Sequence, residues 1–304
     1  MSTTYIGIDV AKHHLDIADS SGIYRLENNK VGFADLLKRI AALGGTAQCV
    51  CESSGGYETA MLMFLSKHGI AVSLVNPTYA KRFIQSLGQK AKTDRIDAEG
   101  LRRYGEVMKP RLWQMPCKNQ RALHELCRRR EEYVSMQSQE KTRMENGYKK
   151  DIERHLNFIG AQIKKLEAKI KEIIAGDELL SKRSKVIREI EGCGEVAVLN
   201  LLVHLPELGQ IGRQELGAIV GLAPYNNDSG QHRGKRMIRG GRKQLRDKLY
   251  LPTLTAMRMN PQIREFAQRL SNKGKPFKVV LIACMRKLLI IINAKIKKFA
   301  LTHT

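Results

Sequence analysis

The order of strand and helix patterns in the first 110 residues limits the possible folds more than any other feature of this chain. Three apolar or alternating runs come first, at 5–11, 14–20 and 22–29, and they predict three strands with a Ser-Gly turn between the last two. Helical and strand patterns then alternate, with helices at 31–43, 57–69, 78–87 and 94–108 and strands at 47–53 and 71–77. The order requires an α/β domain in this part of the chain.

Three strands followed by helix, strand, helix, strand and helix is the order of a ribonuclease H-like domain. In that order an antiparallel meander leads into parallel strands with crossover helices. We therefore expect residues 1–112 to form a ribonuclease H-like α/β domain.

The pattern changes after Pro110 and Pro116, and the chain becomes helical. Seven apolar residues repeat at spacings of 4, 3, 4, 3, 4 and 3: Ile152, Leu156, Ile159, Ile163, Leu166, Ile170 and Ile173. Such a heptad seam predicts a coiled coil, and Asn146-Gly147 predicts a break between two helices of about 30 residues, each roughly 45 Å long. We expect a helical coiled coil at 113–186 and a mostly helical domain at 187–304, so the fold class is α/β plus all-α. The seam does not decide whether its partner helix belongs to the same chain or to another subunit.

The charge of the chain predicts a polyanionic partner. It has 53 Lys and Arg against 30 Asp and Glu, a formal net charge of +23 and a pI near 9.9. Nucleic acid is the common partner of such a chain, and an anionic membrane surface is the alternative. Because the positive charge is spread along the chain rather than confined to one amphipathic helix, the sequence favours nucleic acid over membrane.

The location predicted from the sequence is the cytoplasm. No signal peptide is visible at the N-terminus. The sequence has no run of eighteen uncharged apolar residues, so it predicts no membrane span. The six cysteines (Cys49, Cys51, Cys117, Cys127, Cys193 and Cys284) show no CxxC spacing, so we expect all six to be reduced packing residues in a cytosolic protein.

Four carboxylates occur where a metal site could form. Asp9 lies in the first predicted strand, Glu52 ends another, and Asp94 and Asp97 lie three residues apart on one helix face. An acid inside a strand is costly to bury unless it is paired or binds a metal. Two strand acids and two acids on a later helix are the layout of a two-metal phosphoryl-transfer site, and carboxylate oxygens suit Mg²⁺ or Mn²⁺. The alternative is that these acids only pair with neighbouring basic residues. Nearby Glu58 and Glu99 are interpreted as solvated or as residues that support the ligands.

Two basic or glycine-rich segments are candidate nucleic-acid contacts. Gly192 and Gly194 flank a turn between two apolar segments, resembling a helix-hairpin-helix turn that could bind a phosphate, although an ordinary tight turn would look the same. From 229 to 246 there are seven Lys and Arg and no acid, which suits a sugar-phosphate chain or else a solvated loop. The candidate contacts are Lys92, Arg95, Gly192, Gly194, Arg233, Lys235, Arg236, Arg239, Arg242 and Lys243.

The chain resembles the transposases, or recombinases, of the bacterial insertion-sequence-110 family. The resemblance rests on "YIGIDVAK", "ESSGGYE", "KTDRIDAEGL" and "GLAPYNNDSGQHRGKRMIRGG", and it spans nearly the whole chain. It implies a RuvC-like first domain, a coiled coil and a C-terminal transposase domain. The family's Asp-Glu-Asp-Asp set falls on Asp9, Glu52, Asp94 and Asp97, and its nucleophilic serine falls on Ser229.

The resemblance also implies partners. Family members are guided by a noncoding RNA, the bridge RNA, which the element encodes and which pairs with donor and target DNA. We expect a dimer, or a tetramer of two dimers, acting at the bacterial nucleoid and not at a membrane. Ser229 by itself would pass for a turn residue in "NDSG", and His232 is its only nearby candidate base.

Two other functions would also fit the acids. A RuvC-type Holliday-junction resolvase explains all four, but it gives no role to the coiled coil, the basic loop or Ser229. A nucleic-acid-binding protein with an inert nuclease-like domain explains the charge, but it does not account for four intact acids.

Overall fold

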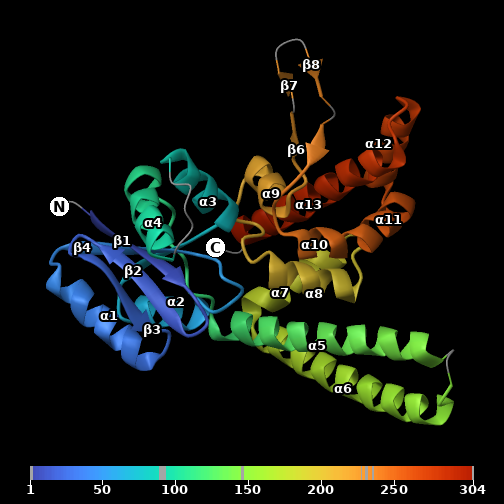
Figure 1. Cartoon of the computed structure of the whole chain (residues 1–304). Coiled ribbons are helices and arrows are strands. Elements are labelled where there is room, and N and C mark those ends of the chain that lie inside the picture. The colour runs from blue at the N-terminus through green and yellow to red at the C-terminus, as the bar shows by residue number, and fades with distance from the viewer. Residues whose placement is uncertain are drawn as a thin grey trace. The chain divides into compact units, whose positions relative to one another are not determined.

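The computed structural model describes residues 3–88, 94–144, 147–226, 228–229, 232–234 and 236–302 of the 304-residue chain. The chain divides into two compact units, Met1–Pro116 and Cys117–Thr304. The first unit holds a five-stranded sheet, and the second is built mostly from helices (Figure 1). A mixed sheet accompanied by many helices is the combination that the sequence predicts.

The first unit follows the predicted order of strands and helices. Its elements are β1 (Thr3–Val10), β2 (His14–Asp19), β3 (Gly22–Glu27), α1 (Lys30–Ala42), β4 (Thr46–Glu52), α2 (Thr59–Lys67), β5 (Ala71–Val75), α3 (Pro77–Ser86) and α4 (Asp94–Met108). The strands lie in the order β3-β2-β1-β4-β5. The β1–β2 and β2–β3 pairs are antiparallel, and the β1–β4 and β4–β5 pairs are parallel. The predicted meander followed by parallel strands is therefore confirmed.

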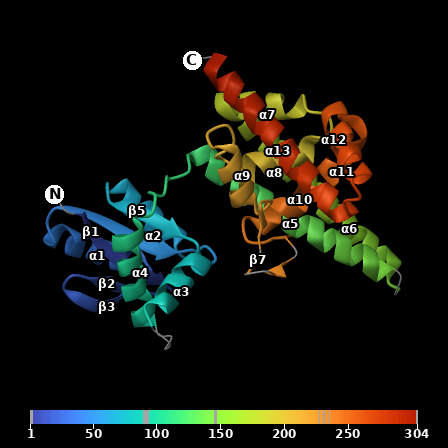
Figure 2. The same cartoon turned by 90° about the horizontal axis from the view of Figure 1, so that it is seen from above.

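The two faces of this sheet are covered by different helices (Figure 2). Ile6 and Ile8 point to one face, where they join Cys49 and Cys51 in a core with α1 and α2. The opposite face packs through Val50 and other buried residues against α3 and α4. The side chains of β1 alternate, so Asp9 belongs to the α4 face. Asp9 therefore lies on the face of the sheet opposite the main hydrophobic core.

Two long helices open the second unit, α5 (Lys118–Arg143) and α6 (Lys149–Gly176), as the sequence predicts. They pack against each other within the chain, and Arg130 of α5 pairs with Glu167 of α6. Every residue of the heptad seam is buried or half-buried, and Ile159 and Ile170 are the most enclosed. The seam therefore faces a helix of its own chain over at least part of its length.

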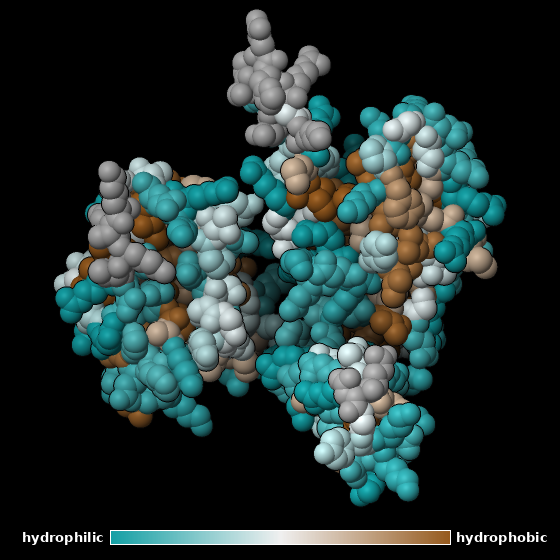
Figure 3. Space-filling view, turned by 45° about the vertical axis from the view of Figure 1, so that its right-hand side comes forward, coloured by the Kyte–Doolittle hydropathy of each residue, from teal (hydrophilic) through white to brown (hydrophobic). Residues whose placement is uncertain are grey.

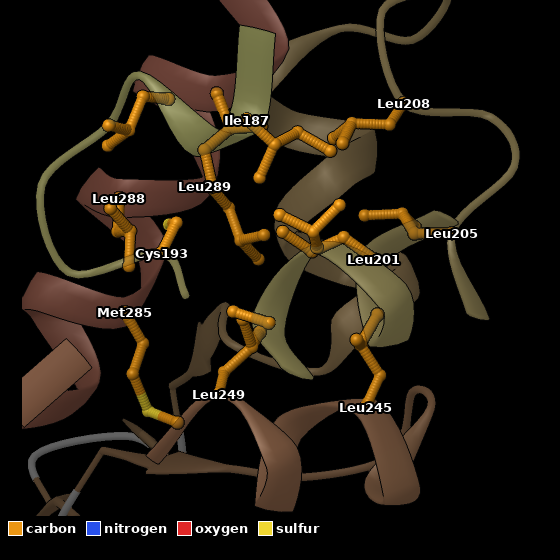
Figure 4. Packing of buried hydrophobic residues seen from close by; sticks show 14 of the residues in the cluster. Ile187, Cys193, Leu201, Leu205, Leu208, Leu245, Leu249, Met285, Leu288 and Leu289 are labelled. Atoms are coloured by element: carbon orange, nitrogen blue, oxygen red, sulfur yellow. The ribbon is translucent and has the colours of Figure 1, made fainter. Parts of the chain in front are cut away.

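The remaining helices of the second unit form one core with the start of α5 and the end of α6. They are α7 (Glu178–Arg188), α8 (Glu195–His204), α9 (Arg213–Val220), α10 (Lys243–Lys248), α11 (Tyr250–Met259), α12 (Pro261–Asn272) and α13 (Phe277–Thr302). Four short strands lie between α9 and α10 and form two antiparallel pairs: β6 (Pro224–Tyr225) with β9 (Met237–Ile238), and β7 (Asp228–Ser229) with β8 (His232–Arg233). Figure 4 shows Leu201, Leu249 and Leu289 converging in this core from α8, the α10–α11 junction and α13.

The surface of the second unit is partly apolar. Large side chains of α11 and the start of α13 are exposed, among them Leu251, Met259, Phe277 and Val279. Figure 3 shows hydrophobic surface on this unit. Exposed apolar surface of this kind is common at protein interfaces.

The structure tests the prediction that all six cysteines are reduced packing residues. All six cysteines are free, and five are buried as expected. Cys117 is exposed instead, and its sulfur accepts the Gln120 N–H at the start of α5, so the expectation of packing is wrong for Cys117. Within the described residues, no helix combines the length and the apolar character needed to cross a membrane.

Candidate active site

A direct backbone contact places α4 on β1. A Cβ atom added to Gly7 would lie 2.0 Å from the carbonyl oxygen of Ala98 and 2.3 Å from the amide nitrogen of Arg102. One added to Gly105 would lie 2.5 Å from the ring of Tyr5. Only glycine allows such close approach at both places. Since the end of α4 lies near Tyr5 and its middle near Gly7, the start of α4 lies near the next residue on this face, Asp9.

The start of α4 carries two of the predicted acids, Asp94 and Asp97. Glu52 reaches the same region from β4, because β4 runs parallel to β1 and Cys51 is in register with Ile8. The next step in that register places Glu52 beside Asp9, on the face opposite the main core. The fold therefore brings all four predicted acids toward one edge of the sheet.

The electrostatics of Asp9 reflect this arrangement. Burial and the nearby carboxylates of Asp97, Glu52, Asp94 and Asp16, in that order, raise the pKa of Asp9 to about 6. Both causes disfavour the charged form of a carboxyl group. A cluster of this kind attracts a divalent cation, and a set of carboxylate oxygens suits a hard metal ion. The residues present therefore fit the divalent metal that the sequence predicts.

The tightest group of possible ligands differs from the predicted one. Among the residues that the structure describes, only His14, Asp16 and Asp94 each bring a ligand atom within 4.8 Å of the others. Of the four predicted acids, only Asp94 belongs to it.

Asp16 and its partner Arg25 were not predicted. We interpret "HLDIADS" in the sequence as a half-exposed strand, but Asp16 and Asp19 are buried, with 2% and 7% exposure. The reason is that β2 is an inner strand, between β1 and β3, and that α4 covers the face that carries Asp16. Asp19 lies on the other face, where Ser21 and Tyr24 donate hydrogen bonds to its carboxylate. The strand register, Asp9 with Asp16 and Asp16 with Arg25, is the signal that could have located both residues.

Glu58 and Glu99 have partners of their own. Glu58 is 5% exposed, and its Oε2 accepts hydrogen bonds from the Ser54 N–H, the Ser54 hydroxyl and the Gly56 N–H at 2.9–3.2 Å. It is therefore not solvated; it holds the loop that directly follows Glu52. Glu99 pairs with Arg102 and Arg103 on α4, and these pairs lower its pKa.

The second unit carries Ser229 on a hairpin. Its backbone is in β7, paired with His232 of β8, and the β6–β9 pair forms the stem (Figure 1). At the base, a Cβ on Gly241 would lie 2.2 Å from the amide nitrogen of Gly221, so the two backbones touch. Arg246 donates to carbonyl groups of Val220, Gly221 and Gly240 there. The base of the hairpin is therefore fixed to the helical core.

The basic candidates differ in their surroundings. Arg95 and Arg236 are exposed, and Arg239 lies over the Tyr225 ring, 5.1 Å from its centroid. Arg242 and Lys243 already have acidic partners, since Arg242 forms a two-fold ion pair with Glu207 and Lys243 pairs with Asp247. Lys92 and Lys235 lie outside the described residues, as does the side chain of Arg233.

The two glycines of the predicted phosphate-binding turn also differ. Gly192 has a φ of +98°, and a Cβ there would lie 2.6 Å from the amide nitrogen of Ala256 on α11. Packing against α11 is thus sufficient reason for glycine at this position. Gly194 is exposed at the start of α8, with no atom within 4 Å of its added Cβ. An exposed helix start is the part of this turn that could meet a phosphate.

Comparisons with known proteins agree with these features. Residues 6–147 match a model described as a transposase, that of the DEDD domain of the insertion-sequence-110 group, and residues 184–268 match the transposase family described as IS116/IS110/IS902. Among curated proteins, the chain is 32% identical to the pilin gene-inverting protein of Moraxella lacunata and 33% identical to that of Moraxella bovis. Each match covers 98% of this chain and 97% of the relative.

Proposed function

The chain belongs to the insertion-sequence-110 family of transposases and is an enzyme of DNA recombination, and from this premise we propose that it cuts and rejoins DNA strands by a metal-dependent, serine-linked and RNA-guided mechanism. The observation that carries the proposal is the convergence of Asp9, Glu52, Asp94 and Asp97 at one edge of the sheet. The strand order supports a ribonuclease H-like, specifically RuvC-like, identity for residues 1–112.

The four acids are proposed to hold Mg²⁺, with Mn²⁺ as an alternative. When bound, such ions polarise the scissile phosphate and ease ionisation of an attacking hydroxyl. The elevated pKa of Asp9 supports a cation-binding role, because the cluster carries like charges that a cation would neutralise. Asp94 and Asp97 contribute from one turn of α4, which fixes their mutual spacing.

Ser229 is the proposed nucleophile. Its hydroxyl gives up a proton, its Oγ forms a bond to phosphorus, and the bond from phosphorus to the departing strand breaks. The departing oxygen takes up a proton, and a phosphoserine ester remains. A hydroxyl of the new partner strand then attacks the same phosphorus, and Ser229 leaves and regains its proton. The ester conserves the energy of the phosphodiester bond, so rejoining needs no ATP.

The basic residues are proposed to hold nucleic acid. Arg236 and Arg239 lie on or beside the Ser229 hairpin and could neutralise charge that develops on the phosphate. The net charge of +23 supports binding of a guide RNA in addition to donor and target DNA. A protein prepared free of RNA should therefore fail to recombine naked DNA. Equal recombination without RNA would remove the guide from the mechanism.

A dimer or tetramer is proposed as the active form. The exposed apolar side chains of α11 and α13 and the half-buried seam of α6 are surfaces that a second chain could cover. The relatives are named as proteins that invert a pilin gene, and inversion requires two DNA sites to be held together.

Replacing Asp94 with Asn tests the metal proposal. This variant should fold normally and lose DNA cleavage, because a carboxylate ligand becomes a neutral amide of the same shape. Cleavage at the wild-type rate by Asp94→Asn in the presence of a chelator would exclude the assignment. Resolution of four-way junctions by wild type and Ser229→Ala at equal rates would instead favour a RuvC-type resolvase.

A further inference from the structure

Three strands present a row of charged side chains on the α4 face of the sheet. Asp9 of β1 is in register with Asp16 of β2, and Asp16 is in register with Arg25 of β3. Residues paired in register project to the same face of a sheet. The row therefore leads from the proposed metal site at Asp9 to Arg25 on β3, the outer strand of the sheet.

Arg25 joins this row to the start of α4. Its Nε and Nη2 donate to the two oxygens of Asp16 at 3.1 and 2.8 Å, and Nη2 also donates to Oδ2 of Asp94 at 3.2 Å. Asp16 is 2% exposed, whereas the side chains of Arg25 and Asp94 are each 54% exposed. Two parallel bonds to a buried carboxylate fix the plane of the guanidinium group. One end of this bridge is thus rigid, and the other end contacts Asp94, whose Oδ2 also lies 3.6 Å from Nε2 of His14.

We propose that Arg25, anchored on Asp16, is a positioning residue that holds Asp94 in the orientation needed for metal binding. The proposal rests on the proposed function, in which Asp94 is a ligand. Arg25 contacts only Oδ2 of Asp94, so this contact does not occupy Oδ1. Carboxylates that bind metals are commonly held by such outer hydrogen bonds, and loss of the outer partner typically weakens metal binding 10- to 100-fold.

A different role would leave metal binding unchanged. Arg25 could serve only to neutralise Asp16, whose buried charge would otherwise be costly. Removal of Arg25 would then lower the stability of the fold and leave the affinity for metal as it was. The two roles are separated by measuring metal binding and thermal unfolding on the same variants.

Calorimetric titration of the full-length protein with Mn²⁺ alone tests the proposal. Arg25→Gln should weaken Mn²⁺ binding about tenfold or more, and Asp16→Asn added to it should weaken binding little further, because both act through one bridge. Arg103→Gln is the matched control, because Arg103 is 50% exposed and pairs with Glu99 on the same helix α4. This control should bind Mn²⁺ as wild type does.

Arg25→Lys covers the case in which Arg25→Gln does not fold. The ammonium group keeps the charge but cannot donate to both oxygens of Asp16 and to Asp94 in one plane, so binding should weaken several-fold. Folded variants that bind Mn²⁺ as tightly as wild type overturn the proposal.

Asp94→Asn separates this inference from the function it rests on. If wild type binds Mn²⁺ and Asp94→Asn does not, unchanged binding by the Arg25 variants overturns the positioning role alone. If wild type does not bind Mn²⁺, or Asp94→Asn binds it equally well, both the metal site and the positioning role are overturned.

Discussion

Asp9 is the residue at which burial and like charge act together. Its pKa, about 6, is above the ordinary value of 3.8 for an aspartate, so the metal-free fold binds a proton at Asp9 more tightly than the unfolded chain does. Stability from this group is therefore fully present below pH 4 and is lost as the pH rises through 6. Above pH 6 the charged Asp9 destabilises the metal-free fold.

Asp9→Asn should therefore stabilise the metal-free protein at pH 8. The gain should be about 1–2 kcal/mol after allowance for partial exposure of the carboxyl group, or a few degrees in unfolding temperature. It should shrink toward zero at pH 4, where the wild-type carboxyl is protonated. Thermal unfolding at both pH values, in the presence of a chelator, measures the difference. A gain that is equal at pH 4 and pH 8 would show that charge at Asp9 is not the cause.

Glu58 should support cleavage without touching DNA. It accepts three hydrogen bonds through one oxygen from the loop after Glu52, so Glu58→Ala releases that loop. Cleavage should fall about 10- to 100-fold while DNA affinity stays near wild type. The control is Glu106→Ala, which removes an acid that is 46% exposed and paired with Arg102. A Glu58 variant as active as this control would reduce Glu58 to an ordinary loop residue.

Single residues can be predicted from the sequence where their type is unusual for the local secondary-structure pattern. Asp9 and Glu52 stand out because an acid is unusual in or directly after an apolar strand. Asp16 and Arg25 are not predicted, because their importance depends on the register of a hairpin, which pairs residues nine apart in the sequence. The ion pair of Arg242 with Glu207 is not predicted either, because the two residues lie 35 positions apart in the sequence.

Among the elements, α4 determines the candidate site, and Gly7 determines where α4 lies. In Gly7→Ala the new methyl group would overlap the backbone of Ala98, so α4 must move away from β1. We expect a loss of about 1–3 kcal/mol in the free energy of unfolding, and a loss of cleavage larger than stability alone explains. Denaturant unfolding and a cleavage assay at a temperature where the variant stays folded measure the two effects.

Gly160→Ala provides the contrast. Gly160 lies in α6 with no atom within 4 Å of an added Cβ, so alanine there should raise helix stability by about 0.5–1 kcal/mol and leave cleavage unchanged. Full activity in Gly7→Ala would mean that the position of α4 does not control the acids.

The seam of α6 is the second element with a testable role. Ile163→Asp combined with Leu166→Asp should break the proposed dimer or tetramer, because unpaired charges are costly to bury. Lys164→Asp, on the exposed face of the same helix, should leave assembly intact. Sedimentation velocity with RNA and DNA present reports the assembly, and circular dichroism reports whether α5 and α6 remain helical. A wild-type protein that sediments as a monomer at every concentration would contradict the proposal.

Elements are predicted well where one periodicity continues for several turns. The heptad spacing and Asn146-Gly147 locate α5 and α6, and the strand order of the sheet follows from connection rules. Contacts between elements are not predicted, because they depend on shape. Gly192 illustrates this, since its packing against α11 involves a helix more than fifty residues later in the chain.

In the whole molecule, each of the two units carries a different chemistry. The first unit supplies carboxylates in a proposed metal site, and the second supplies a serine on a hairpin whose base is fixed by glycine contacts and Arg246. The family membership makes the chain a DNA recombinase, and we propose that Ser229 forms a covalent bond to DNA in a reaction that requires the acids.

Detection of that bond on a denaturing gel is the most direct test. Wild type, Ser229→Ala and Asp94→Asn are each incubated with guide RNA, Mg²⁺ and end-labelled DNA, and are then denatured. We expect a labelled DNA–protein adduct for wild type, which a chelator prevents, and none for either variant, although both still bind RNA and DNA. Strand exchange by Ser229→Ala, with no adduct in wild type, would exclude Ser229 as the nucleophile and indicate direct attack by water.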